Sequence, residues 1–264
     1  MEPWHYDPPP DLAQPLVERL RRFPREPDML VFGVRGLSAV VLRGWLKLYH
    51  RFTVVGRENL PSEGSYVMVA NHCSHLDTLC LQAALPLRKL HRAFPAAAKD
   101  YFFVSTPRVL LAAIVTNALP FDRKLDPRQG LELCGHLLDN PGNVLIVFPE
   151  GTRSETGELR PFKPGLGLLL AGRDVPVVPC LLEGTFAALP KGTSIPRPRS
   201  ICLRIGTPRR YGDRRAGKRS AMEICSDLHD AVAALSADAA KSALPIPRPR
   251  RGSDELQRVG SSVL

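Results

Sequence analysis

Hydrophobic and polar residues alternate along most of this chain in two kinds of run. Short, strongly apolar runs typical of buried strands occur at residues 65–70, 91–98, 143–148, 175–182 and 200–206. Amphipathic stretches at 76–85, 107–117, 127–138 and 165–171 predict helices between them, and apolar residues at three- and four-residue steps over 222–235 predict a last helix. Strands that alternate with helices predict an α/β fold, a single domain with a mixed, mostly parallel central sheet flanked by helices.

The first 50 residues have a different pattern. Residues 1–25 are rich in proline and charge, with a short helical stretch at 12–22. A longer helical pattern over 27–51 interleaves apolar and basic residues and includes Phe32, Trp45 and Tyr49. A basic, aromatic-bearing amphipathic helix is typical of a segment in a membrane interface, although the same apolar stripe would serve a helix packed on its own domain. Both interpretations stay open.

The apolar core of that helix extends from Met29 to Leu42, which is 14 residues, and Arg35 interrupts it. A bilayer requires about 20 residues, so we expect no membrane-spanning helix. We therefore predict an N-terminal helical membrane-contact region over 1–50, a folded domain over 51–241 and a disordered tail over 242–264.

The chain carries a formal net charge of +10, with a pI near 9.6, and therefore favours an anionic partner: nucleic acid, a membrane surface or phosphorylated substrates. Nine arginines and lysines fall between Arg197 and Arg219 against one acid, Asp213.

The six cysteines form no C-x-x-C pair, which indicates reduced thiols in a cytosolic setting. The acidic, proline-rich start is unlike a signal peptide.

The segment from Ala70 to Leu81 places His72 and Asp77 five residues apart, between an apolar run and a helical pattern. Neither a strand nor a helix lets side chains at this spacing meet, so contact requires the chain to turn between them. A histidine held by a carboxylate is a general-base arrangement. No G-x-S-x-G nucleophile motif occurs, which favours activation of a hydroxyl on the substrate itself.

Two other interpretations of the same segment remain. Ser74 or Asp77 is well placed to cap the following helix, and the segment could be a capped turn without chemistry. His72, His75 and Asp77 also superficially match the H-x-H-x-D-H signature of metal hydrolases. Further ligands are missing at the expected positions, so we expect no metal site.

A second polar constellation follows the apolar run at 143–148. Pro149 and Gly151 end the strand in a turn at its carboxyl end, where ligands bind in α/β sheets. Arg153 offers a planar fork for phosphate, Lys163 adds a second positive charge, and Glu150 could accept a hydrogen bond from a hydroxyl. An exposed polar loop would carry the same residues.

Arg123 lies just after another apolar stretch, in the segment from Asn117 to Lys124. There it could bind a ligand or form a surface ion pair with Asp122.

Together these segments resemble the glycerolipid acyltransferase family, the bacterial 1-acylglycerol-3-phosphate O-acyltransferases in particular. The family's four blocks occur in order over residues 50–210. They are N-H-x-x-x-x-D at 71–77, a Phe-x-Asp-Arg type block at 119–123, F-P-E-G-T-R-S at 148–154 and V-P-V-x-P at 175–179. Pro120 departs from the small or apolar residue that is commoner in the second block.

The resemblance implies roles for individual residues. His72 would be the base and Asp77 its partner. Glu150, Gly151, Thr152 and Arg153 would bind the acyl acceptor, with Lys163 and Arg123 helping to hold its phosphate.

The resemblance also implies transfer of a fatty acyl group from an acyl thioester, acyl-CoA or acyl carrier protein, to the free hydroxyl of lysophosphatidic acid, giving phosphatidic acid. Glycerol 3-phosphate or another lysolipid is the alternative acceptor. No metal or organic cofactor is required.

An anionic membrane surface is then the expected partner of the basic residues. We expect no nucleic acid as a partner, because no nucleic-acid-binding motif accompanies the charge. The implied location is the cytoplasmic face of the cell membrane, peripheral or monotopic. The alternative from another class is an inactive basic protein that binds lipid or nucleic acid.

Overall fold

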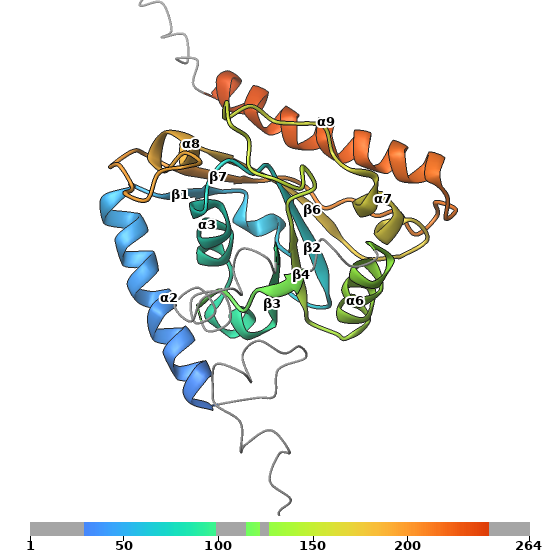
Figure 1. The fold of residues 1–264 in the computed structure, drawn as a ribbon, viewed down its shortest axis with the longest axis horizontal. Coiled ribbons are helices and arrows are strands. Elements are labelled where there is room, and N and C mark those ends of the chain that lie inside the picture. Colours follow the sequence, from blue (N-terminus) through green and yellow to red (C-terminus); the bar gives the residue numbers. More distant parts are fainter. Residues whose placement is uncertain (1–28, 99–114, 122–126, 243–264) are drawn as a thin grey trace, which may run out of the picture.

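The computed structural model describes residues 29–98, 115–121 and 127–242 (Figure 1). Its centre is a seven-stranded sheet in the order β1-β7-β6-β2-β5-β3-β4. Neighbouring strands run parallel except β6 and β7, which are antiparallel. The predicted α/β fold with a mixed, mostly parallel sheet is therefore confirmed. The strands are β1 (Thr53–Val55), β2 (Tyr66–Ala70), β3 (Ala93–Ala98), β4 (Leu119–Phe121), β5 (Val144–Val147), β6 (Val177–Glu183) and β7 (Cys202–Ile205).

The five predicted strands agree with β2, β3, β5, β6 and β7 to within two residues at every end. The pattern missed β1 and β4, the two edge strands of the sheet. Each has three residues, too few to show an alternating period. They are recognisable only by their pairing with β7 and β3.

Helices cover both faces of the sheet (Figure 1). α2 (Met29–Tyr49), α3 (Leu76–Ala84) and the 3-10 helix η2 (Leu87–Arg92) lie on one side, and α6 (Pro127–Asp139), α7 (Pro164–Leu170) and α9 (Lys218–Ser242) on the other. The short helices η1 (Arg57–Asn59) and α8 (Thr185–Ala188) follow β1 and β6. The predicted helix at 12–22, most of that at 107–117 and the tail beyond Ser242 fall outside the described residues.

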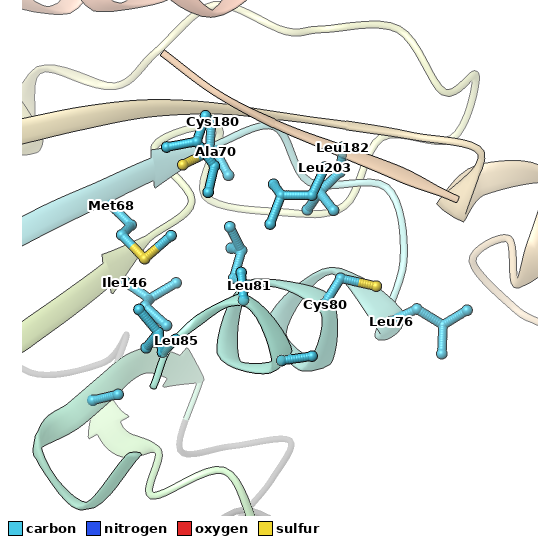
Figure 2. Packing of buried hydrophobic residues seen from close by; sticks show 14 of the residues in the cluster. Met68, Ala70, Leu76, Cys80, Leu81, Leu85, Ile146, Cys180, Leu182 and Leu203 are labelled. Atoms are coloured by element: carbon cyan, nitrogen blue, oxygen red, sulfur yellow. The ribbon is translucent and has the colours of Figure 1, made fainter. Parts of the chain in front are cut away.

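The central strands β2 and β5 are apolar throughout because the sheet is buried on both faces there. On β2, Met68 and Ala70 belong to the cluster under α3, whereas Val67 and Val69 belong to the cluster under α7 and α9. Figure 2 shows the first cluster, in which Leu81 of α3 faces the sheet. The strands β2 and β5 are neighbours and are covered on both faces, and the loops that follow them therefore start from a well-packed part of the sheet.

The prediction that the N-terminal segment is too short to span a membrane is wrong. α2 has 21 residues and is long and apolar enough, by length and composition, to cross one. Arg35, which the sequence places as an interruption, is buried against the domain together with Val31 and Leu46. Its charge therefore does not face the side of the helix that is available to lipid.

The opposite side of α2 is apolar and exposed. It carries the residues we call the exposed stripe, at mostly three- and four-residue steps: Leu30, Val34, Leu37, Val40, Val41 and Leu48. Leu37 is 68% exposed and Leu48 is 84% exposed. One side of α2 therefore packs on the domain, as one of the two interpretations predicts, and the other side has an unusual amount of exposed apolar surface.

The basic residues between Arg197 and Arg219, which are close together in the sequence, do not form a single surface. β7 runs antiparallel to β6, so Cys202 pairs with Glu183 at the carboxyl end of β6, and Arg209 bridges to Val177 at its start. Arg197 and Arg199 thus lie near the carboxyl end of β6, and the segment that begins at Arg209 lies near its start. Several residues of this segment are already paired, in Arg209–Asp227, Arg210–Asp174, Arg214–Glu223 and Arg219–Glu223.

Candidate active site

His72 and Asp77 meet at the carboxyl end of β2. The chain turns between the end of β2 at Ala70 and the start of α3 at Leu76, as their spacing requires. This turn brings Nδ1 of His72 to 2.8 Å from Oδ2 of Asp77. Asp77 is fully buried, whereas the His72 side chain is 19% exposed. The carboxylate thus holds an imidazole that solvent and ligands can reach.

The same oxygen of Asp77 also fixes the backbone of the turn. Oδ2 accepts the backbone N–H of Cys73 and that of Ser74, each at 2.7 Å. The Ser74 hydroxyl in turn accepts the backbone N–H of Leu76 at 3.1 Å, so Ser74 caps the start of α3. Asp77 therefore shapes the loop as well as orienting the imidazole.

Phe148, at the end of β5, packs flat on the imidazole. The two ring centroids are 4.1 Å apart and the planes are inclined by 18°. With Nδ1 bound to Asp77 and one ring face covered, Nε2 is the nitrogen left to take a proton. The sequence identifies Phe148 only as part of a block and does not indicate this contact.

The third sequence block is tied directly to the backbone of His72. The His72 N–H donates to Oε1 of Glu150 at 2.8 Å, and its carbonyl accepts the N–H of Ser154 at 2.7 Å. Glu150 is only 3% exposed, so its carboxyl group faces the loop and not the open site. Burial raises the pKa of Glu150 to about 7, although the backbone N–H groups of His72 and Arg160 lower it.

Gly151 allows the turn after Glu150. Its φ is +73°, a conformation that a side chain disfavours, and a Cβ would lie 2.6 Å from Nζ of Lys163. The Lys163 side chain therefore crosses this turn, and its backbone N–H donates to the carbonyl of Pro149 at 2.9 Å. Thr152 and Arg153 follow on the same turn and are half-buried. The structure thus gathers these predicted residues, while Arg123 lies outside the described residues.

Asn71 joins the site to the next strand. Its side-chain Nδ2 donates to the carbonyl of Leu182 at 3.0 Å, and its Oδ1 accepts the Leu182 N–H at 2.8 Å. Because the Asn71 side chain bonds both the C=O and the N–H of Leu182, it continues the hydrogen bonding between β2 and β6 beyond the end of β2. Asn71 is the first residue of the first sequence block, and this position could have identified it as part of the site.

Cys73 lines a hollow of about 340 Å³ behind the loop that carries His72, between the end of β6 and α9. Burial, together with the nearby carboxyl groups of Asp77 and Glu150, raises the pKa of its thiol to about 12. The thiol therefore stays protonated near neutral pH and is a poor nucleophile. No group of three or more histidine, cysteine, aspartate or glutamate side chains in metal-binding geometry occurs among residues 29–98, 115–121 and 127–242.

Comparison with known proteins gives a consistent picture. The model of the family described as "Acyltransferase" matches residues 51–183. The chain is 36% identical over 148 residues to 1-acyl-sn-glycerol-3-phosphate acyltransferase BAT2, chloroplastic, of Brassica napus, covering 55% of this chain and 41% of the relative. It is 33% identical over 139 residues to 1-acyl-sn-glycerol-3-phosphate acyltransferase alpha of Homo sapiens, covering 50% and 46%. It thus spans less than half the length of these two relatives.

A solved structure also has the same fold. The crystal structure of the 1-acyl-sn-glycerophosphate (LPA) acyltransferase PlsC from Thermotoga maritima matches with a TM-score of 0.60 and 21% sequence identity. The match covers 85% of this chain and 87% of that one. At this identity the match shows a common fold.

Proposed function

The chain belongs to the acyltransferase family, and on that premise we propose that it transfers a fatty acyl group from a thioester to the free hydroxyl of lysophosphatidic acid, giving phosphatidic acid. The names of its relatives support this acceptor. The observation that carries the proposal is the bond of 2.8 Å between the partly exposed His72 and the buried Asp77. Acyl-CoA and acyl carrier protein are both suitable donors.

The proposed reaction is a direct transfer. Nε2 of His72 takes the proton of the acceptor hydroxyl while that oxygen attacks the thioester carbonyl carbon. The tetrahedral intermediate collapses, the carbon–sulfur bond breaks, and the imidazolium returns its proton to the departing thiolate. Asp77 fixes the tautomer with the proton on Nδ1 and stabilises the imidazolium that forms.

We assign the acceptor phosphate to the turn after β5. Arg153 would hold it with a bidentate fork, and Lys163, which crosses Gly151, would add a second charge. Thr152 and Arg123 are assigned to the same acceptor. Glu150 is better suited to hold the His72 backbone than to contact a ligand, because its carboxyl group is buried.

We propose that the exposed stripe of α2 lies in a membrane interface, on the cytoplasmic face. Although α2 is long enough to cross a bilayer, its other face packs on the domain, which supports a helix parallel to the surface. Tyr49 at its end donates to the carbonyl of Pro196 at 2.9 Å, so the exposed Arg197 and Arg199 lie close enough to meet anionic headgroups. The proposed organisation is a membrane-contact region over 1–50, the acyltransferase domain over 51–241 and a tail over 242–264.

The test is acyl transfer by the purified protein, measured by mass spectrometry. Lysophosphatidic acid, glycerol 3-phosphate and lysophosphatidylcholine are each offered with acyl-CoA and with acyl carrier protein. We expect phosphatidic acid to form from the first acceptor with at least one donor. Product from another acceptor alone, or no product from any pair, would contradict the proposal.

A further inference from the structure

Phe148 lies beside His72 because both residues continue the same face of two neighbouring strands. On β2 and β5, the residues of this face belong to the hydrophobic cluster under α3: Tyr66, Met68, Ala70, Val144 and Ile146. Alternate side chains of a strand share a face, so residues 72 and 148 come next on this one, and Phe148 is itself packed against the cluster. The two strands pair in parallel, with Val69 opposite Val147. The two rings therefore meet just beyond the strand ends.

The turn after β5 fixes the backbone of Phe148. Its carbonyl accepts the N–H of Gly151 at 3.0 Å. From the same turn, Oε1 of Glu150 accepts the N–H of His72, and the N–H of Ser154 donates to the His72 carbonyl. Phe148 and His72 thus belong to two loops that are joined by hydrogen bonds, and the positions of the two rings are set by this shared backbone.

The Phe148 ring lies on the face of the imidazole and not against its nitrogen atoms. The ring planes are inclined by 18° and the centroids are 4.1 Å apart, while Nδ1 bonds to Asp77. The face of a phenyl ring carries negative partial charge, so it attracts a cation placed over it. Two neutral rings gain less from this arrangement than from an edge-on contact. The geometry therefore favours the protonated imidazole over the neutral one.

We propose that Phe148 is a positioning residue that fixes the plane of the His72 imidazole and stabilises the imidazolium formed during acyl transfer. Because the attraction arises when His72 takes the proton of the acceptor hydroxyl, it favours the transition state over the resting enzyme. Removing the ring should lower kcat by about 5-fold, the size expected of one cation–π contact. The role in acyl transfer rests on the proposed function, but the effect of the ring on the charge of His72 does not.

An NMR titration of the histidine ring signals tests this effect without any activity measurement. Wild type, Phe148→Leu, Phe148→Tyr and Phe162→Leu are compared, and the His72 signal is assigned by its loss in His72→Ala. Leucine keeps an apolar side chain over the imidazole but has no π-face, whereas tyrosine keeps that face. Phe162→Leu is the matched control, because it removes a ring from a different histidine, His229, which the Phe162 ring contacts edge-on at 78°.

The ring stabilises the charged imidazole, so its removal should move the His72 titration midpoint in Phe148→Leu to lower pH by about 0.7 of a pH unit. Phe148→Tyr and Phe162→Leu should titrate like wild type. Asp77 and Glu150, the carboxyl groups bonded to His72, are present in all these variants, so the difference reports the ring alone. An unchanged or raised midpoint in Phe148→Leu, or an equal decrease in Phe162→Leu, would overturn the proposal.

The pH profile of acyl transfer then separates stabilisation of the cation from a loss of packing. In Phe148→Leu, kcat should fall about 5-fold, and the acid limb of kcat/KM should move to lower pH with the titration midpoint. The KM values for the thioester and for lysophosphatidic acid should stay close to those of wild type, and Phe148→Tyr should keep the wild-type kcat.

A fluorinated ring gives the sharpest comparison. Pentafluorophenylalanine at position 148 keeps the shape of the ring but reverses the charge of its face, so it should lower kcat at least as much as leucine does. A wild-type kcat with the fluorinated ring would overturn the proposal. If wild type itself transfers no acyl group, the proposed function fails, while the NMR titration still decides whether the ring stabilises the charged His72.

Discussion

The substitution Glu150→Gln tests whether a buried carboxyl group holds the loop that carries His72. Glu150 is 3% exposed, and its Oε1 accepts the backbone N–H of His72. Its other oxygen is buried and has no hydrogen-bond partner within the described ranges. Burial raises the pKa of this carboxyl group from 4.5 to about 7. A glutamine keeps the acceptor for the His72 N–H and removes the titration.

The magnitude follows from the difference between the folded and unfolded pKa. Between pH 4.5 and about 7 the folded protein holds a proton on Glu150 that the unfolded chain releases. The stabilising effect of that proton is complete below the unfolded pKa and is lost as the pH rises through the folded pKa. A difference of between two and three pKa units corresponds to about 3 kcal/mol of unfolding free energy.

The assay is urea unfolding of wild type and Glu150→Gln at pH 5 and pH 8, followed by circular dichroism. Wild type should lose about 3 kcal/mol more than the variant between these two pH values. Glu155→Gln is the matched control, because Glu155 lies in the same loop but is exposed and pairs with Lys191. This control should follow wild type. The same pH dependence in wild type and Glu150→Gln would refute the buried, titrating carboxyl group.

Three further predictions concern acceptor binding, the turn after β5 and the membrane. Arg153→Lys should lose almost as much kcat/KM on lysophosphatidic acid as Arg153→Ala, because an ammonium cannot replace the bidentate fork. Both losses should be smaller on an acceptor without phosphate, and equal losses on both acceptors would count against a phosphate contact. Gly151→Ala should lower the unfolding free energy by about 1–2 kcal/mol in urea titrations, since its φ of +73° disfavours a side chain; unchanged stability would show that the turn relaxes. Replacing Leu37 and Val41 of the exposed stripe with glutamate should release the protein from anionic liposomes in a sedimentation assay; undiminished binding would exclude that face.

The sequence predicts the pairing of His72 with Asp77 because their spacing allows contact only across a turn. The inward orientation of Glu150 could not be predicted in this way. It depends on a hydrogen bond to His72, 78 positions away in the chain, and so on the pairing of β2 with β5. A sequence block identifies Glu150 as a polar residue at the end of a strand but does not indicate which side of the turn it faces.

Two predictions from the sequence were wrong. Arg35 was counted as an interruption of an apolar segment of 14 residues, but tertiary contacts bury it and α2 has 21 residues. The basic residues between Arg197 and Arg219 are close together in the sequence, but β7, which runs antiparallel to β6, separates them to the two ends of β6. In both cases the position of a charge in the sequence did not indicate where its side chain lies in space. The edge strands β1 and β4 were missed because only their partners define them.

The most direct test of the central claim is the kcat for acyl transfer to lysophosphatidic acid by His72→Ala, compared with wild type and with His75→Gln. If His72 is the general base, its removal should lower kcat by at least about 100-fold while circular dichroism shows an intact fold. His75→Gln, a change in the same loop, should cause only a modest loss. A His72→Ala variant that keeps most of its turnover would contradict the account, and so would a His75→Gln variant that is as inactive as His72→Ala.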